Sequence, residues 1–258
     1  MIQKINNLIN SEYKALIAEK EAKLSYLQAQ MDPHFLFNSL EALRMIAEVD
    51  DNIRVSDGLF SLGKVLKAHI HTKTMTWLEE EIDIVNCYVN VQNLRFGGRI
   101  HLETCIQEGL GRIEAPALTL QPLVENAILH GFKFKSADCR IKITAEAAEG
   151  DDVTISVRDN GVGFDCAALC AINGYIATGA NRGIPSNGNG IALINLHERI
   201  KLYYGGRYGL SISSGPNLET RVSITLARKT IYNTADTSPC SHPSDASNNL
   251  PGSGAPYP

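Results

Sequence analysis

The sequence lacks any hydrophobic run that approaches the ~20 consecutive apolar residues of a transmembrane helix. Its first residues are also too polar for a secretory signal peptide. These two absences favour a cytoplasmic chain. At 258 residues, the chain is long enough for one large domain or two small ones.

A strong charge and a metal-binding cysteine pattern are missing as well. The formal net charge of −4 is mild and gives no support for nucleic-acid binding. The cysteines form no C-x-x-C pair and show no spacing with histidine that is typical of a zinc site. We therefore expect free thiols in a reducing compartment. The six cysteines are Cys87, Cys105, Cys139, Cys166, Cys170 and Cys240.

The two ends of the chain differ in character. Residues 229–258 are rich in Ser, Pro, Asn and Gly and contain almost nothing apolar, which predicts disorder. Residues 1–26 are predicted to form a helix whose heptad of apolar residues slips by one position. A slipped heptad is typical of a signalling coiled coil that enters a dimeric bundle, and the alternative is an amphipathic helix packed on its own chain. The stripe is Ile2, Ile5, Ile9 and Leu16, then Ile17, Leu24 and Met31.

Three further helices are predicted before residue 98. Asp32 and Pro33 either start a helix or kink a continuous one, and His34 follows them outside the apolar stripe. Two stripes separated by a polar turn predict a helical hairpin, which is half of a four-helix bundle that a second chain completes. The first stripe is Leu36, Leu40, Leu43 and Ala47, and the second is Val55, Leu59, Leu62, Leu66 and Ile70. The third helix follows Thr76 and carries Leu78, Ile82, Val85 and Val89.

From Arg99 onward the apolar residues alternate, which predicts strands. The first strand carries Ile100, Leu102, Thr104 and Ile106, and later strands are predicted at residues 141–145, 153–157, 210–214 and 221–226. Helices are predicted at residues 120–131 and 191–204. Residues 166–189 are rich in Gly, Asn and Ala and are interpreted as a mobile loop over a site. These elements predict a two-layer α/β sandwich.

Three segments of this second region carry residues suited to nucleotide binding. In LQPLVENAILHG the apolar residues recur at helical spacing, so Glu125, Asn126 and His130 fall on the opposite face, where they suit a metal–phosphate group. Asp159 ends a strand, and its carboxylate can accept from an exocyclic amine. Gly161 and Gly163 follow it and let the backbone approach a flat ring. Gly188 and Gly190 precede an amphipathic helix, where free N–H groups attract phosphate.

In this order, LQPLVENAILHG, VRDNGVGFD and GNGIALINLHER resemble the N, G1 and G2 boxes of the GHKL (Bergerat) ATP-binding domain of histidine kinases, gyrase, Hsp90 and MutL. Upstream, LQAQMDPHFLFNSLEAL resembles the phosphoacceptor box of LytS/YesM-type sensor histidine kinases. The resemblance extends from about Leu24 to Leu226. It implies an α+β chain with a signalling helix at residues 1–26, a helical dimerisation hairpin at 27–98 and an ATP-binding domain at 99–228.

The resemblance implies a role for each motif residue. His34 is the expected phosphoryl acceptor, because a histidine presents a neutral, nucleophilic ring nitrogen near pH 7. Asn38 lies one turn later on the same face and is expected to steer the phosphoryl group or a water. Asn126 is the expected Mg²⁺ ligand, Glu125 orients water or ligand, and His130 meets phosphate.

The remaining nucleotide contacts come from the G1 and G2 boxes. Asp159 is expected to recognise adenine. The other expected contacts are Gly161, Gly163, Gly188, Gly190 and Asn195. Two departures from the family pattern stand near the phosphates: Ala192 replaces the third glycine of the G2 box, and Asn217-Leu218-Glu219-Thr220 replaces a G-x-G-T turn. Both favour weaker nucleotide use.

The function implied is that of a two-component kinase core. A homodimer would bind ATP and Mg²⁺, phosphorylate His34 and pass the phosphoryl group to an aspartate of a response regulator, with no nucleic-acid partner. The family usually carries a membrane sensor upstream, so this region is expected to be cytoplasmic. The main alternative is a non-catalytic, ATP-gated dimeric scaffold, favoured by Ala192 and Glu219. A gyrase-type ATPase is disfavoured because a phosphoacceptor box is present and a transducer domain is not.

Overall fold

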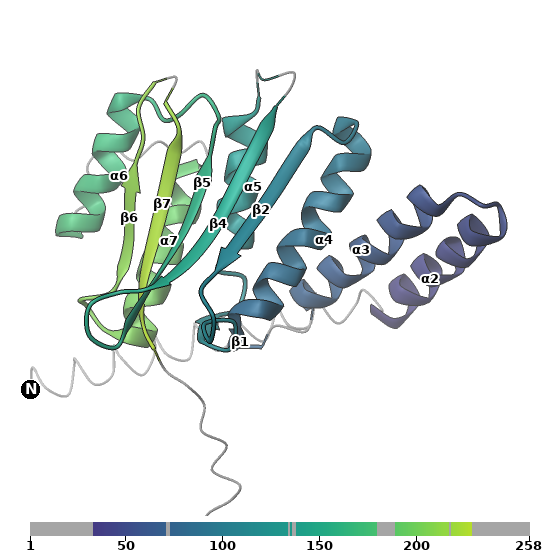
Figure 1. Ribbon diagram of the computed structural model, residues 1–258, viewed down its shortest axis with the longest axis horizontal. Coiled ribbons are helices and arrows are strands. Elements are labelled where there is room, and N and C mark those ends of the chain that lie inside the picture. Colours follow the sequence, from purple (N-terminus) through teal and green to yellow (C-terminus); the bar gives the residue numbers. More distant parts are fainter. Residues whose placement is uncertain are drawn as a thin grey trace, which may run out of the picture.

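A computed structural model of the chain describes residues 33–70, 73–133, 135, 138–179, 189–216 and 218–228 (Figure 1). The predicted helix at residues 1–26, the predicted disorder of residues 229–258, Gly188 and Cys240 lie outside the described residues. The five cysteines within them are free thiols, as predicted. In the same part of the chain, no helix is both long and apolar enough to cross a membrane.

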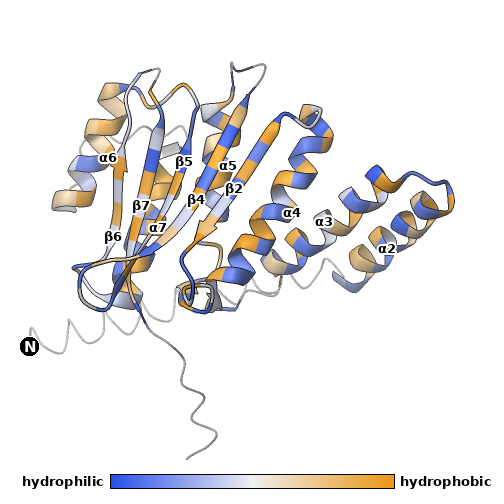
Figure 2. Ribbon diagram, in the orientation of Figure 1, coloured by the Kyte–Doolittle hydropathy of each residue, from blue (hydrophilic) through white to orange (hydrophobic). Residues whose placement is uncertain are grey.

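The predicted helical hairpin consists of α2 (Pro33–Val49) and α3 (Ile53–Ile70), which pack side by side (Figure 1). Between them, Asp51 adopts a left-handed φ of 51°, and the carbonyl of Asn52 accepts from the N–H groups of Val55 and Ser56 in the first turn of α3. Of the predicted first stripe, Ala47 is buried, whereas Leu36 and Leu43 remain exposed in the single chain. The hairpin carries many hydrophobic residues (Figure 2, orange), and they are only partly buried within one chain.

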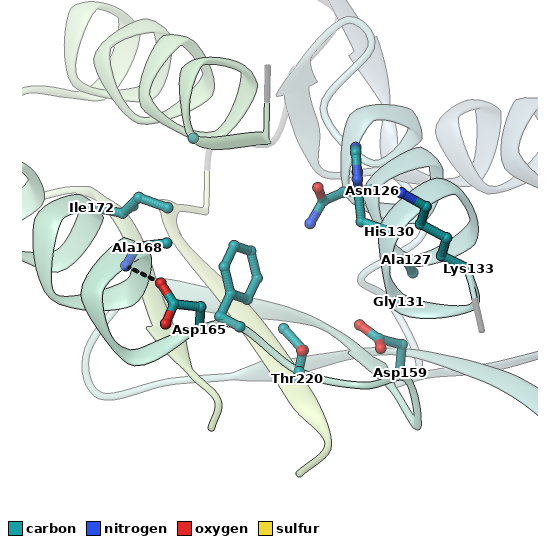
Figure 3. Close-up of a pocket in the computed structure, with 13 residues that line it drawn as sticks. Asn126, Ala127, His130, Gly131, Lys133, Asp159, Asp165, Ala168, Ile172 and Thr220 are labelled. Carbon is teal, nitrogen blue, oxygen red and sulfur yellow. Dashed lines mark hydrogen bonds between the residues drawn. The ribbon is translucent and has the colours of Figure 1, made fainter. Parts of the chain in front are cut away.

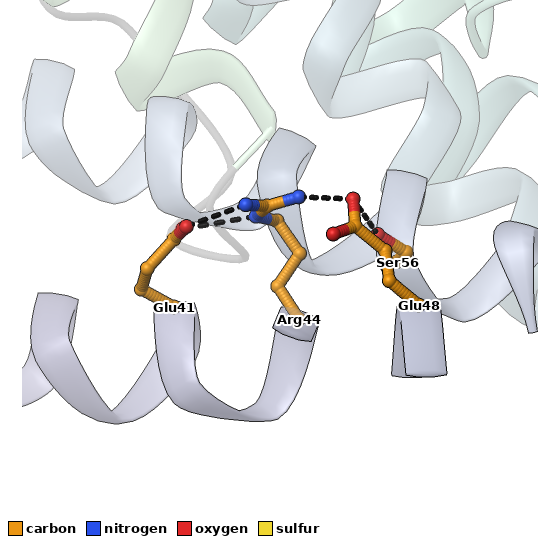
Figure 4. A network of polar contacts seen from close by, with 4 residues as sticks. All are labelled: Glu41, Arg44, Glu48 and Ser56. Atoms are coloured by element: carbon orange, nitrogen blue, oxygen red, sulfur yellow. Dashed lines mark hydrogen bonds and ion pairs between the residues drawn. The ribbon is translucent and has the colours of Figure 1, made fainter. Parts of the chain in front are cut away.

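A polar network joins the two helices of the hairpin (Figure 4). Arg44 donates to both carboxylate oxygens of Glu41 at 3.0 and 2.6 Å, and it also pairs with Glu48. Glu48 in turn accepts from the hydroxyl of Ser56 on α3 at 3.3 Å. The neighbouring guanidinium lowers the pKa of Glu41. Solvent-exposed ion pairs contribute little to stability, and the bond between Ser56 and Glu48 is what joins this network to α3.

Helix α4 (Leu78–Phe96) lies between the hairpin and the sheet (Figure 1). One of its faces packs on α3, while Val85, Tyr88 and Val89 join the same buried core as the strands. It starts after the short strand β1 (Met75–Trp77), which pairs with β3 (Glu114–Pro116), and it ends at Gly97, whose φ is 70°. The hairpin and the sheet are thus connected through one helix that contacts both.

The sheet has the order β2-β4-β5-β7-β6. Its strands are β2 (Ile100–Ile106), β4 (Cys139–Ala147), β5 (Asp152–Asp159), β7 (Thr220–Ala227) and β6 (Gly209–Ser213). Only β2 and β4 run parallel, and the other pairs are antiparallel. Alternate residues such as Ile143, Ile155 and Ile224 are fully buried, and helices cover that face. The predicted two-layer sandwich is confirmed, and it places the ends of β5 and β7 beside the helices that carry the motifs.

The loop predicted at residues 166–189 is wrong for its first part, which forms helix α6 (Cys166–Thr178). Asp165 caps this helix by accepting from the N–H of Ala168 at 3.0 Å, and Gly179 ends it with a φ of 70°. The segment has few large apolar residues, but it has four alanines, and alanine is the strongest helix former. Ile172 is buried, and Leu169 and Ile176 pack partly buried against the same core.

Candidate active site

A cavity of about 430 Å³ lies between the N-box helix, the end of β5, α6 and the start of α7 (Asn189–Tyr204). In Figure 3, Asn126 and His130 face it from one side, and Asp165 and Ile172 face it from the other, with Asp159 and Thr220 on the floor. The structure brings together five of the residues predicted from the motifs. They are Asn126, His130, Asp159, Gly163 and Gly190.

The predicted N-box helix consists of two pieces. Helix α5 (Gln121–Asn126) has Pro122 in its first turn, where a missing N–H costs nothing, and a π-helical turn (Ala127–Gly131) follows. The predicted apolar stripe of Leu120, Leu123, Val124, Ala127 and Ile128 is buried, as expected. Wide turns of this kind occur often at functional sites. The turn begins directly after Asn126 and contains His130, whose pKa is lowered by partial burial and the charge of Lys133.

Asp159 is the most perturbed acid in the cavity. Its side chain is only 6% exposed at the end of β5, and it accepts from the N–H of Gly161 at 2.9 Å. Burial raises the pKa of this carboxyl to about 6, with a further contribution from the charge of Glu219. A buried carboxylate with one backbone donor keeps acceptor capacity for a ligand. It is therefore suited to accept from an amine inside the cavity.

The glycines after Asp159 are required by close backbone contacts. A Cβ on Gly161 would lie 2.5 Å from the Cα of Gly131, so the turn packs directly on the end of the N box. Gly163 has a φ of +75°, and a Cβ there would overlap the carbonyl oxygen of Gly215. These contacts explain why the DNGVG segment needs small residues, and they fix the floor of the cavity against its wall.

Some predicted residues do not line the cavity. Glu125 contacts the hydroxyl of Tyr88 at 3.4 Å, and Asn195 is exposed on α7. Ala192 also lies on an exposed part of α7, within the helix and away from the cavity lining. That its methyl group crowds a phosphate stays a prediction. Glu219, in contrast, acts on the site through the charge that it places near Asp159.

Sequence reasoning missed several residues that line the cavity, including Lys133, Phe164, Asp165 and Thr220. Thr220 lies opposite Asp159 in the register of β5 and β7, and its hydroxyl lies 3.0 Å from that of Ser214. Thr220 lies far from Asp159 in the sequence, and only the pairing of β5 with β7 brings it to the cavity. Among the described residues, no group of three or more His, Cys, Asp or Glu side chains forms a metal site. A magnesium ion would then depend on nucleotide phosphates and water for most of its ligands.

His34 occupies the second position of α2, and its side chain is exposed. The side-chain nitrogen of Asn38 lies 3.2 Å from Nδ1 and 3.3 Å from Nε2 of the His34 ring, one helical turn away. The two residues therefore share a face of the helix, as predicted. In Figure 1, α2 lies at the opposite end of the molecule from α6, so the single chain does not bring His34 to the cavity.

Comparison with known proteins agrees with this arrangement. Residues 22–100 match a family model described as histidine kinase, and residues 113–230 match one described as histidine kinase-, DNA gyrase B- and HSP90-like ATPase. Sensor histidine kinase YesM of Bacillus subtilis is 37% identical over 227 residues, which cover 88% of this chain and 37% of that protein. Sensor protein LytS of the same organism is 30% identical over 210 residues, covering 80% and 34% respectively.

The chain thus spans about a third of the length of these curated relatives. Among solved structures, the histidine kinase domain of the blue-light activated histidine kinase EL346 from Erythrobacter litoralis matches 82% of this chain and 93% of that one, with 14% identity and a TM-score of 0.43. The two family models follow each other along the chain in the same order as the hairpin and the sandwich. The chain therefore belongs to the LytS/YesM-type family of sensor histidine kinases.

Proposed function

We propose that the chain is the kinase core of a two-component sensor, which binds Mg·ATP in the cavity and phosphorylates His34. The observation that carries this proposal is the cavity itself, where a buried acceptor, Asp159, meets close-packed glycines and Asn126. Its volume of about 430 Å³ is within the range of small-molecule sites. Asp159 would accept from the exocyclic amine of adenine. Asn126 would hold Mg²⁺, which supplies charge neutralisation at the phosphates.

The transfer needs a ring nitrogen of His34 to attack the γ-phosphorus while the bond to the leaving ADP oxygen breaks. A new N–P bond then holds the phosphoryl group, and ADP departs with its oxygen charge. Asn38 restrains the ring through its side-chain amide. Because α2 lies at the opposite end of the molecule from α6 (Figure 1), which lines the cavity, the hairpin must move, or a second chain must supply the histidine. An aspartate of a response regulator is the proposed final acceptor.

The direct test is incubation with Mg²⁺ and γ-labelled ATP, followed by acid and by base. A label that survives base and is lost in acid identifies phosphorus on a histidine nitrogen. The non-catalytic scaffold predicts bound ATP and no label. That alternative is favoured by the two departures Ala192 and Glu219, of which Glu219 places its charge near Asp159.

We expect a homodimer held by the hairpin, because large apolar side chains remain exposed on α2 and α3. The variant Ile46→Asp introduces a charge at a residue that is 57% exposed on α2, and it should weaken the dimer by about tenfold or more. The matched control is Leu202→Asp on α7, where the leucine is 80% exposed and outside the hairpin. Light scattering at micromolar concentration gives the mass. A monomeric parent, or equal effects of the two variants, would contradict this interface.

We also expect ATP affinity to fall as the pH drops through about 6. The carboxyl of Asp159 has its pKa raised to this value by burial, and its protonated form no longer offers a charged acceptor to the adenine amine. Below that pH the affinity should fall by roughly tenfold per pH unit. Equilibrium nucleotide titration from pH 5 to 8 measures the effect. The variant Glu219→Gln removes a neighbouring charge that raises the pKa of Asp159, so the midpoint of the pH dependence of ATP binding should move to lower pH. An unchanged midpoint would argue against Asp159 as the titrating group.

A further inference from the structure

The turn that precedes the N-box helix has an unusual backbone. Leu118 adopts a φ of +58°, which is strained for a residue with a Cβ, and Thr119 and Leu120 are fully buried beside it. Non-glycine residues keep such conformations only where the surrounding structure holds them. The turn leads directly into α5, whose last residue is Asn126. Whatever holds this turn therefore sets where α5 begins.

Glu81 of α4 holds the turn from one side. Its carboxylate accepts from the backbone N–H groups of Leu118, Thr119 and Leu120 at 2.6, 2.8 and 2.9 Å. The residue is only 1% exposed, and burial raises the pKa of its carboxyl against the opposing effect of these three donors. Burying a carboxylate is costly unless hydrogen bonds satisfy it, so three converging N–H groups mark a site built around this side chain.

Arg199 of α7 holds the same turn from the other side. Its Nη2 donates to the carbonyl oxygen of Leu118 at 2.8 Å, and its positive charge acts on Glu81. Helix α7 begins at the opposite wall of the cavity, where Gly190 lies. The turn therefore connects three elements: α4, the helix α5 that ends at Asn126, and the helix α7 that starts at Gly190. None of the nucleotide-box motifs includes Glu81.

We propose that Glu81 is a positioning residue for the nucleotide site: together with Arg199 it holds the Leu118–Leu120 turn and thereby sets the start of α5 relative to α7. The inference rests on the proposed function, because it assigns Glu81 to the cavity in which ATP binds. Glu81 is not among the residues that line the cavity, so it acts through the turn to which it is hydrogen-bonded. Helix α4 also packs on α3 of the hairpin. The contact between Glu81 and the turn therefore links the geometry of the cavity to the hairpin through α4.

The variant Glu81→Gln tests this role, because it keeps the size of the side chain and removes one acceptor and the charge. We expect the dissociation constant for Mg·ATP to rise by about tenfold, measured by equilibrium titration well below the thermal midpoint of the variant. Glu80→Gln is the matched control, since Glu80 pairs with Lys73 and Thr76 and not with the turn. It should bind ATP within about twofold of the parent.

A second substitution tests whether the strained backbone of the turn is what Glu81 holds in place. Leu118→Gly removes the strain of the left-handed backbone, so Glu81→Gln/Leu118→Gly should regain a large part of the lost affinity. If Glu81→Gln does not fold, Arg199→Met perturbs the turn from α7, and it should also weaken ATP binding. Parent-like affinity in a folded Glu81→Gln or Arg199→Met, with only a lower thermal midpoint, would overturn the proposal. A parent chain that binds no ATP would instead refute the proposed function.

Discussion

Replacing His34 by glutamine is expected to reduce phosphoryl incorporation from γ-labelled ATP to background. Glutamine has no ring nitrogen with a nucleophilic lone pair, so the N–P bond cannot form. ATP binding should be unchanged, because His34 lies on α2 and does not line the cavity. The variant is therefore expected to lose phosphoryl transfer and to keep ATP binding. The labelling assay measures the transfer, and a nucleotide titration measures the binding.

The control for this substitution is another exposed histidine. His101 lies on the edge strand β2, outside the cavity, and His101→Gln should be labelled like the parent. The parent label should be lost in acid and survive base, as expected for phosphorus on an imidazole nitrogen. If His34→Gln incorporates as much label as the parent, the acceptor assignment is wrong. If neither the parent nor any variant is labelled while ATP binds, the scaffold alternative gains support.

The sequence predicted those helices and strands in which burial of one face makes the apolar residues recur at regular spacing. The stripe from Leu120 to Ile128 is buried as expected, because a helix packed on a sheet must turn one apolar face inward. The strands alternate for the same reason, with one face covered and the other open. Helix α6 was missed although it packs on the core through Ile172, which is buried, and through Leu169 and Ile176, which are partly buried. Its apolar residues Leu169, Ile172 and Ile176 do recur at helical spacing, but the glycine- and asparagine-rich composition of residues 166–189 was given more weight.

The residues of the candidate site also fall into two groups, those that local motifs predicted and those that only the fold brings together. Asn126 and Asp159 were identified because their motifs lie within short segments, and the structure places both at the cavity. Glu81 and Arg199 meet the Leu118–Leu120 turn across gaps of 37 and 81 residues, measured to Leu118. A contact at that separation leaves no local pattern, and only the fold reveals it. The contact between Tyr88 of α4 and Glu125 also leaves no local pattern in the sequence. Burial raises the pKa of the Tyr88 hydroxyl.

Asp159→Asn is expected to weaken ATP binding by about 100-fold, or roughly 2–3 kcal/mol. The new amide keeps an oxygen that can accept from the N–H of Gly161, as the present carboxylate does at 2.9 Å. Its second atom is an NH₂ group, which turns a donor toward the donor amine of adenine. The side chain is 6% exposed, so water cannot replace the lost acceptor. Removing a buried charge should not itself unfold the domain, and circular dichroism verifies this.

The same substitution should change the base preference of the site. Guanine carries a carbonyl oxygen where adenine carries its amine, so the NH₂ group of the new amide can donate to it. We expect the ratio of GTP to ATP affinity to rise by about tenfold or more relative to the parent. The matched control is Asp165→Asn, at another acid of the cavity wall, where asparagine still caps α6 and both affinities should stay within about twofold. If Asp159→Asn keeps the parent affinity for ATP and its discrimination against GTP, Asp159 does not contact the base. The adenine would then have to lie elsewhere in the cavity.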